Sequence, residues 1–366
     1  MRILTVNAGS TSVKLERYDL DSPLAELAAP PAPGWAAETT PDAADGEIAR
    51  ALRDGADAVA HRFVRLPDDA PAVLRLDADA VAAIARIGGE APLHDAGALR
   101  GVALVRRLSP AMPQLAVDDG AFHRTMPEAA TTYAIPRELT RRGLRRRGYH
   151  GLSHEYAAHR ACALAGIDLA NARIVTAHLG GGSSLCAVDR GVSIDTTMGY
   201  TPLEGLPMAT RSGSVDPGLL LHLLREGTTP GELEVMLERR SGLLGISGST
   251  GDVRTLLNAG DDPDARLAVE VLCWRLRAAI GAMIGVLGGI DLLVFTGGIG
   301  QHAAAIRAAG VPGAAAAGAE LDAERNAAPA GDARISADGS RAGVFVVSAR
   351  EGWQLARQGY RAISKG

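Results

Sequence analysis

The stretch Ile174-Val-Thr-Ala-His-Leu-Gly-Gly-Gly-Ser-Ser184 runs from an apolar strand into a turn of three glycines. Two polar loops follow it, Thr201-Pro-Leu-Glu-Gly-Leu206 and Thr210-Arg-Ser-Gly-Ser-Val-Asp-Pro217, and the second carries one arginine. Glycine lets the backbone approach an anion closely, and free N–H groups together with a guanidinium can hold a phosphoryl group. A glycine triplet alone is more typical of a tight turn in an α/β sheet, but the three segments together indicate a phosphate-binding turn.

The start of the chain has the same pattern. Arg2-Ile-Leu-Thr-Val6 predicts a strand, Asn7-Ala-Gly-Ser-Thr-Ser12 a polar turn, and Val13-Lys-Leu-Glu-Arg-Tyr18 the returning strand. When Gly9 is aligned with Gly180, Ser12 falls on Ser183. Two strand–turn–strand segments of one kind predict a duplicated domain.

Composition limits the classes of protein that need to be considered. The 366 residues predict two or three domains, and the 47% hydrophobic content can fill sizeable cores. The net charge of −4 gives no overall attraction to nucleic acid or to an anionic membrane. Residues 278–290, the longest apolar stretch, are too few and too rich in glycine to span a membrane.

The expected location is the cytoplasm. Cys162, Cys186 and Cys273 lie far apart, without metal-ligand or redox spacing, which suits a reducing compartment. A strand begins almost at the first residue, so no signal peptide is expected. We therefore expect no nucleic-acid partner and no membrane partner.

The order of predicted elements indicates an α/β protein, because strands alternate with helices. Residues 23–45 are rich in Pro and Ala and predict a surface connection. Asp216-Pro217 predicts the start of a helix, with the aspartate as its N-cap. Helices are predicted near residues 48–53, 78–86, 137–145, 154–165 and 264–287 and at the C-terminus, and strands near 114–117, 185–188, 192–195, 291–295 and 343–347.

Two familiar nucleotide and nucleic-acid signals are weak or missing. Residues 137–147 hold six arginines, which fit either a nucleic-acid patch or a solvated helix face, and the acidic overall balance favours the helix face. The turns at 7–12 and 296–300 lack the G-x-G-x-x-G spacing, and no G-x-x-x-x-G-K-[ST] loop occurs. Any nucleotide site is therefore of another type.

Ten segments, in order, resemble the acetate kinase family of the actin–hexokinase–Hsp70 superfamily, and they cover nearly the whole chain. They are Asn7-Ala-Gly-Ser-Thr-Ser-Val-Lys14, His61-Arg62, Ala91-Pro-Leu-His94, Asp119-Gly-Ala-Phe-His123, Gly148-Tyr-His-Gly-Leu-Ser-His154, His178–Ser184, Tyr200-Thr-Pro-Leu-Glu-Gly205, Thr210–Pro217, Ser241-Gly-Leu-Leu-Gly245 and Phe295–Gly300. The resemblance implies two duplicated ribonuclease-H-like (actin-like ATPase) domains with an active-site cleft between them, and a homodimer. Residues 1–123, completed by a helix at 353–366, would form one domain and residues 124–352 the nucleotide-binding other.

The implied reaction is reversible transfer of the ATP γ-phosphoryl group to acetate or propionate, giving ADP and an acyl phosphate, with Mg²⁺ or Mn²⁺. Arg62 and Arg211 match the arginines that hold the carboxylate and the phosphoryl group, a task that suits a planar, permanently charged fork. His150 matches the histidine that donates to the phosphoryl group in the transition state. Since a carboxylate needs no deprotonation at pH 7, Asp119 is expected to orient the metal, its waters or an arginine rather than to act as a base. Asn7 and Glu351 match the metal positions.

The resemblance also implies a nucleotide site. Ser10, Ser12 and Lys14 match the phosphate turn of the first domain, and His178, Gly180 and Gly182 belong to that of the second. Asp252, Val253 and Arg254 match the adenosine loop, with Asp252 toward the ribose and Arg254 beside the base. Gly297, Gly298, Ile299 and Gly300 match the other wall, where the absence of side chains lets the purine lie flat.

The acyl pocket of the family corresponds here to Val64, Leu93, Tyr149 and Pro202. The Tyr149 hydroxyl either lies at the pocket wall or hydrogen-bonds away from it. One methylene changes binding by only about 1–3 kcal/mol, so the residue types leave acetate, propionate and a more polar acid open.

Departures from the family pattern keep other functions open. Gly181 replaces an asparagine near the phosphates, Gln301-His302 follows the adenine turn, and the family's Glu-Glu pair is Glu351-Gly352. The alternatives are a kinase for butyrate or another carboxylate, a member that uses pyrophosphate or another donor, a binding protein that has lost transfer, and a hydrolase. Each matched residue taken singly also fits an ordinary structural role.

Overall fold

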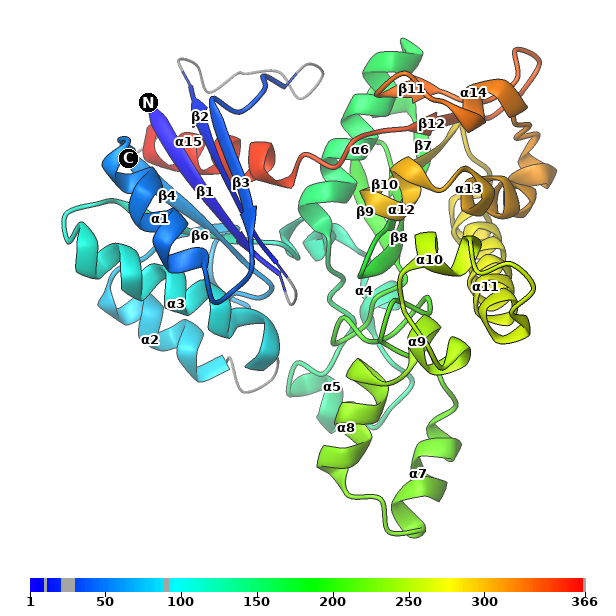
Figure 1. The fold of residues 1–366 in the computed structure, drawn as a ribbon, viewed down its shortest axis with the longest axis horizontal. Helices are drawn as coiled ribbons and strands as arrows, with labels where there is room; N and C mark the ends of the chain where they lie inside the picture. The colour runs from blue at the N-terminus through cyan, green and yellow to red at the C-terminus, as the bar shows by residue number, and fades with distance from the viewer. Residues whose placement is uncertain (10–11, 21–29, 88–91, 365–366) are drawn as a thin grey trace. The chain divides into compact units, whose positions relative to one another are not determined.

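The computed structural model describes residues 1–9, 12–20, 30–87 and 92–364, without the side chains of 92–95. The chain forms two compact units (Figure 1). Unit 1 consists of residues 1–121 and 350–366, and unit 2 of residues 122–349.

Unit 1 is built on a six-stranded sheet of order β3-β2-β1-β4-β6-β5. Its strands are β1 (Arg2–Ala8), β2 (Val13–Asp19), β3 (Trp35–Thr39), β4 (Ala58–Phe63), β5 (Val73–Arg75) and β6 (Gln114–Asp118). β1, β4 and β6 run parallel, while β2, β3 and β5 are antiparallel to their neighbours. The carboxyl ends of the three parallel strands therefore share one edge, where ligands of open α/β sheets commonly bind.

Helices cover both faces of this sheet (Figure 1). α1 (Ala44–Arg53) and α3 (Pro92–Leu108) pack on the face that carries Leu4, Val6 and Leu15. α2 (Ala78–Ile87) contributes Ile84 to a second cluster. α15 (Glu351–Ser364) packs on the opposite face, against β1, β2 and β4.

Unit 2 repeats the topology of unit 1. Its strands are β7 (Arg173–Leu179), β8 (Ser183–Asp189), β9 (Val192–Thr196), β10 (Leu292–Thr296), β11 (Ala333–Arg334) and β12 (Gly343–Val346). The order β9-β8-β7-β10-β12-β11 matches β3-β2-β1-β4-β6-β5, with β7, β10 and β12 parallel. The predicted duplication is confirmed.

The alignment of Ser12 with Ser183 is wrong by one position. In the first hairpin Ala8 pairs with Val13, five positions further along the chain, whereas Leu179 pairs with Ser183, four positions further along. Ser183 therefore begins β8, while Ser12 precedes β2.

The core of unit 2 lies between its sheet and the long helix α11 (Pro263–Leu287), and α6 (Gly151–Ala165) packs on the other face, against β7 and β10 (Figure 1). Asp262 caps α11 through the N–H groups of Asp264 and Ala265, and Gly288 ends the helix in the left-handed conformation. The other helices are α4 (Glu128–Thr131), α5 (Arg137–Arg141), α7 (Pro217–Arg225), α8 (Pro230–Arg239), α9 (Gly242–Ser247), α10 (Val253–Leu257), α12 (Gly297–His302), α13 (Ala304–Gly310) and α14 (Ala323–Ala327), with 3-10 turns η2 (Ala121–Thr125), η3 (Leu169–Asn171) and η4 (Val311–Ala317).

Most predicted elements are present, including the helix that Asp216 caps through the N–H of Gly218. Two predictions are wrong. The supposed connection 23–45 contains β3, a half-exposed edge strand whose alternation is hidden among Ala and Pro, although residues 23–29 lie outside the described part. The helix expected over 137–145 is only α5, because Gly143 takes a positive φ of 86° and stops it. Among the described residues, none of the helices combines the length and apolarity needed to cross a membrane.

Candidate functional site

In unit 1, the ends of β4 and β6 bring Arg62 and Asp119 together. Arg62 Nη2 donates to Asp119 Oδ2 at 2.6 Å, and the Asp119 side chain is fully buried. A charge-assisted hydrogen bond of this length is strong and fixes the direction of the guanidinium. The pair supports the expectation that Asp119 orients an arginine.

The end of β1 in the same unit carries the expected metal positions. Asn7 Nδ2 donates to Glu351 Oε2 at 2.9 Å, although 344 residues separate the two in sequence. Lys14 lies opposite Asn7 in the β1–β2 pair and is exposed, and the Ser12 hydroxyl donates to Glu38 at 2.8 Å. Ser10 lies outside the described residues.

Asn7 and Glu351 fit a magnesium ion. Mg²⁺ prefers carboxylate and carbonyl oxygens, keeps several waters, and usually takes only one or two carboxylates together with substrate phosphates. In the described part of the chain, no three His, Cys, Asp or Glu side chains gather into a preformed metal cluster. An ion held by two protein groups and by the substrate is consistent with that arrangement.

In unit 2, His150 directly precedes α6 as its N-cap residue and has a strained backbone conformation. It has a φ of 59°, which is uncommon for a residue with a side chain and recurs at functional sites. The turn is held from both sides, because a Cβ on Gly148 would lie 2.6 Å from His123 and from Thr196. His123 Nε2 donates to the Tyr149 carbonyl at 2.9 Å.

A chain of short hydrogen bonds runs from β7 to His150. Thr176 Oγ1 lies 2.7 Å from His154 Nδ1, His154 Nε2 lies 2.8 Å from Ser184 Oγ, and Ser184 Oγ lies 2.9 Å from His150 Nδ1. Burial lowers the pKa of His154 well below its usual 6.5, so this ring is neutral and carries one N–H.

The distances assign a direction to this chain. The other possible acceptor for the Thr176 hydroxyl is the carbonyl oxygen of Cys186. It lies 3.5 Å from Thr176 Oγ1, which is long for a hydrogen bond. Thr176 therefore donates to His154, His154 donates to Ser184, and Ser184 donates to His150 Nδ1. With Nδ1 as the acceptor, the N–H group of the His150 ring lies on Nε2.

His150 Nε2 and Arg211 both approach the glycine turn. A Cβ on Gly182 would lie 3.1 Å from His150 Nε2 and 3.6 Å from Arg211 Nη1. His178 stacks on His150 with ring centroids 4.3 Å apart, and its Nδ1 lies 2.7 Å from the Ser153 hydroxyl. Unit 2 thus brings together two predicted catalytic side chains and the expected phosphate turn.

The loop that carries Arg211 is fixed by close backbone packing. Arg211 Nη1 donates to the Pro202 carbonyl at 3.0 Å. Side chains at Gly242 and Gly251 are excluded, because their Cβ atoms would lie 2.2 Å from the Met208 carbonyl and 2.3 Å from the Ala209 carbonyl.

Sequence reasoning missed the network behind this loop. Arg146, from the arginine-rich run, donates to the carbonyls of residues 196–198 and to Glu204 Oε1 at 2.7 Å. The Tyr133 hydroxyl donates to Glu204 Oε2 at 2.5 Å, and burial with this hydrogen bond raises the pKa of Tyr133 to about 12. The network anchors residues 196–204 and hence Pro202, the partner of Arg211.

The expected purine wall, residues 297–300, lies beside the turn at residues 180–182. Gly297 has a φ of 76°, and its Cβ would lie 2.5 Å from the Leu179 carbonyl, whereas nothing lies within 4 Å of a Cβ on Gly298. The N–H of Gly298 lies 3.9 Å from the Cβ position of Gly180, so the two turns are neighbours. Gly297, Gly298, Ile299 and Gly300 are the first four residues of α12.

Asp252 caps α10 through the N–H of Arg254, and the two side chains form an exposed ion pair of 3.3 Å. The Val253 side chain belongs to the core, so its backbone alone is available to a nucleotide.

The expected acyl-pocket residues come from both units. Val64 is buried in unit 1, and Leu93 is the second residue of α3, where its side chain is outside the described part. Tyr149 and Pro202 are buried in unit 2. The Tyr149 hydroxyl donates to the Tyr200 carbonyl at 2.5 Å, which answers the question of where its hydroxyl bonds.

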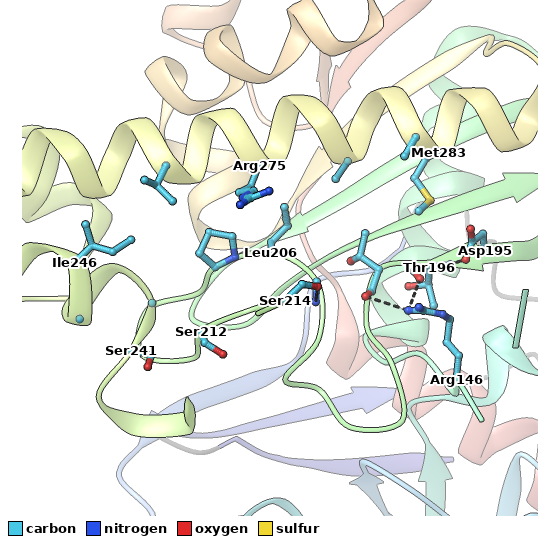
Figure 2. Close-up of a pocket in the computed structure, with 18 of the residues that line it drawn as sticks. Arg146, Asp195, Thr196, Leu206, Ser212, Ser214, Ser241, Ile246, Arg275 and Met283 are labelled. Carbon is cyan, nitrogen blue, oxygen red and sulfur yellow. Dashed lines mark hydrogen bonds between the residues drawn. The ribbon is translucent and has the colours of Figure 1, made fainter. Parts of the chain in front are cut away.

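A cavity of about 610 Å³ lies in unit 2 between α11 and the loops around Arg211 (Figure 2). Its lining includes Arg146, Leu206, Ser212, Ser214, Arg275 and Met283. His150 and Arg211 do not line it, although Ser212 follows Arg211 directly. The cavity therefore adjoins the loop that carries Arg211 and is lined by Ser212 and Ser214 of that loop, but not by His150 or Arg211.

Known proteins resemble this chain over almost its whole length. A model described as the acetokinase family matches residues 42–357. The acetate kinase of Gloeobacter violaceus is 40% identical over 407 aligned residues, which cover 100% of both chains. Two solved structures superpose with a TM-score of 0.85. One is an acetate kinase from Porphyromonas gingivalis, 31% identical with 99% of each chain covered, and the other a propionate kinase from Francisella tularensis, 32% identical with 98% covered. With the two equivalent sheets, these matches confirm the predicted α/β fold with two duplicated domains.

Proposed function

Because the chain belongs to the acetokinase family, we propose that it transfers the γ-phosphoryl group of ATP reversibly to the carboxylate of acetate or propionate. An oxygen of the carboxylate attacks the γ-phosphorus in line with the bond to the bridging oxygen of ADP. That bond breaks, ADP leaves, and an acyl phosphate forms. Since two anions must meet, catalysis consists mainly of positioning and charge neutralisation.

The observation that carries the proposal is the approach of His150 Nε2 and Arg211 Nη1 to the backbone of Gly182. A phosphoryl group held on this turn is within reach of an imidazole N–H donor and of a permanent positive charge. Both groups are fixed in advance, His150 by Ser184 and Arg211 by the Pro202 carbonyl. Preorganised donors of this kind stabilise the charge that develops in the transition state.

Arg62 is proposed to hold the substrate carboxylate. Its Nη2 group donates to buried Asp119, and this hydrogen bond fixes the plane of the guanidinium. Such a fork can give a carboxylate two parallel hydrogen bonds.

Mg²⁺ (or Mn²⁺) is the proposed cofactor, and Asn7 and Glu351 are proposed to hold it. When bound, the ion supplies positive charge that neutralises the nucleotide phosphates. The Asn7 amide N–H donates to Glu351, which leaves the amide oxygen as a further acceptor on the same side chain. Ser10, Ser12 and Lys14 are proposed to contact the phosphates from the first hairpin.

The remaining nucleotide contacts are proposed for unit 2. His178, Gly180 and Gly182 would meet the phosphates, the purine would lie on Gly297–Gly300, and Asp252, Val253 and Arg254 would flank the ribose and the base. The open space at Gly298 supports this arrangement, because a flat ring needs a wall without a side chain. Val64, Leu93, Tyr149 and Pro202 are proposed to surround the acyl group. Since the Tyr149 hydroxyl is bonded to a carbonyl, Tyr149 would present an apolar ring edge, which favours a simple alkyl acid.

The proposal is tested by measuring acid-dependent release of ADP from ATP. We expect the Arg211→Ala and His150→Ala variants to lose about 10²–10³-fold in kcat, the range for removal of one preorganised donor. Arg239→Ala, at the exposed end of α8, is the matched control and should keep the parent rate. Parent-like turnover by Arg211→Ala would overturn the role given to this arginine.

We further propose that the chain works as a homodimer in the cytoplasm. α7 has no buried residue, and Leu219, Leu221 and Leu224 are between 38% and 52% exposed. An apolar helix without a buried face gains stability from a partner. Cys162, Cys186 and Cys273 are free thiols, which suits a reducing compartment. Light scattering should give twice the chain mass for the parent and a smaller value for Leu221→Glu, whereas a monomeric parent would contradict the homodimer.

A further inference from the structure

Glu16 occupies the space that a side chain at position 352 would take. A Cβ built on Gly352 would lie 1.5 Å from Glu16 Oε2 and 2.6 Å from its carboxyl carbon. Gly352 follows Glu351 directly at the start of α15. The carboxylate of Glu16, from β2, thus lies where a side chain at residue 352 would begin, next to Glu351 in the chain.

The sheet of unit 1 presents Glu16 to the proposed metal position. Asn7 pairs with Lys14 and Thr5 pairs with Glu16, and a single pair of residues separates these two pairs, so Asn7 and Glu16 lie on the same face. α15 packs against this face, where Asn7 bonds to Glu351. Lys14, Arg350 and Glu351 lie close enough to act on Glu16 electrostatically.

Neighbouring contacts fix the Glu16 carboxylate. The Tyr18 hydroxyl donates to Glu16 Oε2 at 3.1 Å, and the Tyr18 ring lies against fully buried Trp353 with centroids 5.4 Å apart. Residues 16–18 and 351–353 therefore interlock, and any side chain at position 352 has to compete with Glu16.

We propose that Glu16 supplies the second carboxylate of the divalent-cation site, beside Glu351 and Asn7. This inference rests on the proposed function, because that function gives the cation its role. Glu16 acts as a positioning residue that adds negative charge and accepts hydrogen bonds from waters of the ion. Outer groups of this kind typically change metal affinity by about 10–100-fold.

The experiment measures Mn²⁺ binding to the whole protein, without nucleotide or acid, from the loss of the free-ion EPR signal. Glu16→Gln is expected to weaken binding about tenfold or more. Asp19→Asn removes the same charge from an exposed position on the same strand and should change affinity less than about twofold. Gly352→Glu alone should lower the melting temperature, because its side chain collides with Glu16.

The exchange variant Glu16→Ala/Gly352→Glu is the sharpest arm, because it moves the carboxylate from β2 to α15. We expect it to regain the melting temperature that Gly352→Glu alone loses. We also expect it to bind Mn²⁺ within about threefold of the parent. The inference would be overturned by unchanged affinity in folded Glu16→Gln, or by a folded exchange variant that binds as weakly as Glu16→Gln. A parent that does not bind Mn²⁺ would also overturn it. Since no acid is present, a failure of the proposed function would not affect these readings.

Discussion

Replacement of Ser184 by alanine tests whether the hydrogen-bond chain sets the proton of His150. Ser184 is fully buried, and its hydroxyl lies 2.9 Å from His150 Nδ1 and 2.8 Å from His154 Nε2. The variant removes both contacts and adds no volume.

The structure gives separate magnitudes for stability and for rate. His154 Nε2–H would lose its acceptor in a buried place, which costs about 1–3 kcal/mol of unfolding free energy. His150 would lose one neutral hydrogen bond of about 0.5–1.5 kcal/mol, the contact that favours the proton on Nε2. Converted to rate, this loss lowers kcat by about 2–13-fold.

Ser193→Ala is the matched control. Ser193 is also fully buried and lies 2.8 Å from a histidine, His123, that is not part of the chain to His150. We expect a similar loss of stability in urea unfolding and a kcat within about twofold of the parent. Nitrogen NMR of labelled histidine should show the His150 proton on Nε2 in the parent and a mixture of tautomers in Ser184→Ala. A parent tautomer with the proton on Nδ1, or equal loss of kcat in both variants, would refute the reasoning.

Three further predictions follow from the glycine turns and a buried histidine. Gly297→Ala should lose more than about 2 kcal/mol of stability, from left-handed strain and a clash with a strand carbonyl, whereas Gly298→Ala should unfold like the parent but raise KM for ATP. Gly182→Ala should lower kcat at least about tenfold, because its methyl group lies 3.1 Å from an imidazole nitrogen, whereas Gly181→Ala faces open space and should not. Burial lowers the pKa of His61 from 6.5 to about 4. Between pH 6.5 and pH 4, His61 therefore takes up a proton in the unfolded state but not in the folded state. The free energy of unfolding should fall by about 3 kcal/mol as the pH drops from 6.5 to 4.

Each of these predictions has an opposing outcome. Equal melting temperatures of Gly297→Ala and Gly298→Ala would contradict the predicted clash at position 297. Equal kcat values of Gly182→Ala and Gly181→Ala would contradict the predicted contact at position 182. A pH profile of unfolding that is the same in the parent and in a His61→Gln variant would contradict the assigned pKa.

The glycine turns could be predicted because their signals are local. Each follows an apolar strand, and the same order of residue types occurs twice in the chain, so both hairpins and the duplication were accessible from the sequence. The ends of β7 and β10 then meet through parallel pairing, in which Thr296 lies beside His178. That pairing places two distant glycine turns together.

The supporting networks could not be predicted in the same way, because their partners are distant in sequence. Glu204 lies 58 residues from Arg146 and 71 from Tyr133, and no periodicity connects them. A weaker signal existed for the chain to His150, since Thr176 and His178 are two apart on one strand and must share a face. The register that brings Ser184 to that face came only from the structure.

The pair of Glu16 and Gly352 shows the same limit. From the sequence, Glu351-Gly352 could be interpreted only as the loss of a carboxylate. The compensation lies on another strand, and it becomes visible only when α15 is packed on the sheet.

A hydroxylamine trap for acyl phosphate tests carboxylate phosphorylation most directly. The purified protein would receive Mg²⁺ and ATP with acids from formate to butyrate and with lactate, beside Arg211→Ala. The account predicts hydroxamate that requires ATP, is greatest with acetate or propionate, and falls to background in the variant. Hydroxamate formed only with pyrophosphate would contradict the proposed donor, and no hydroxamate with any acid, while ATP still binds, would contradict carboxylate phosphorylation itself.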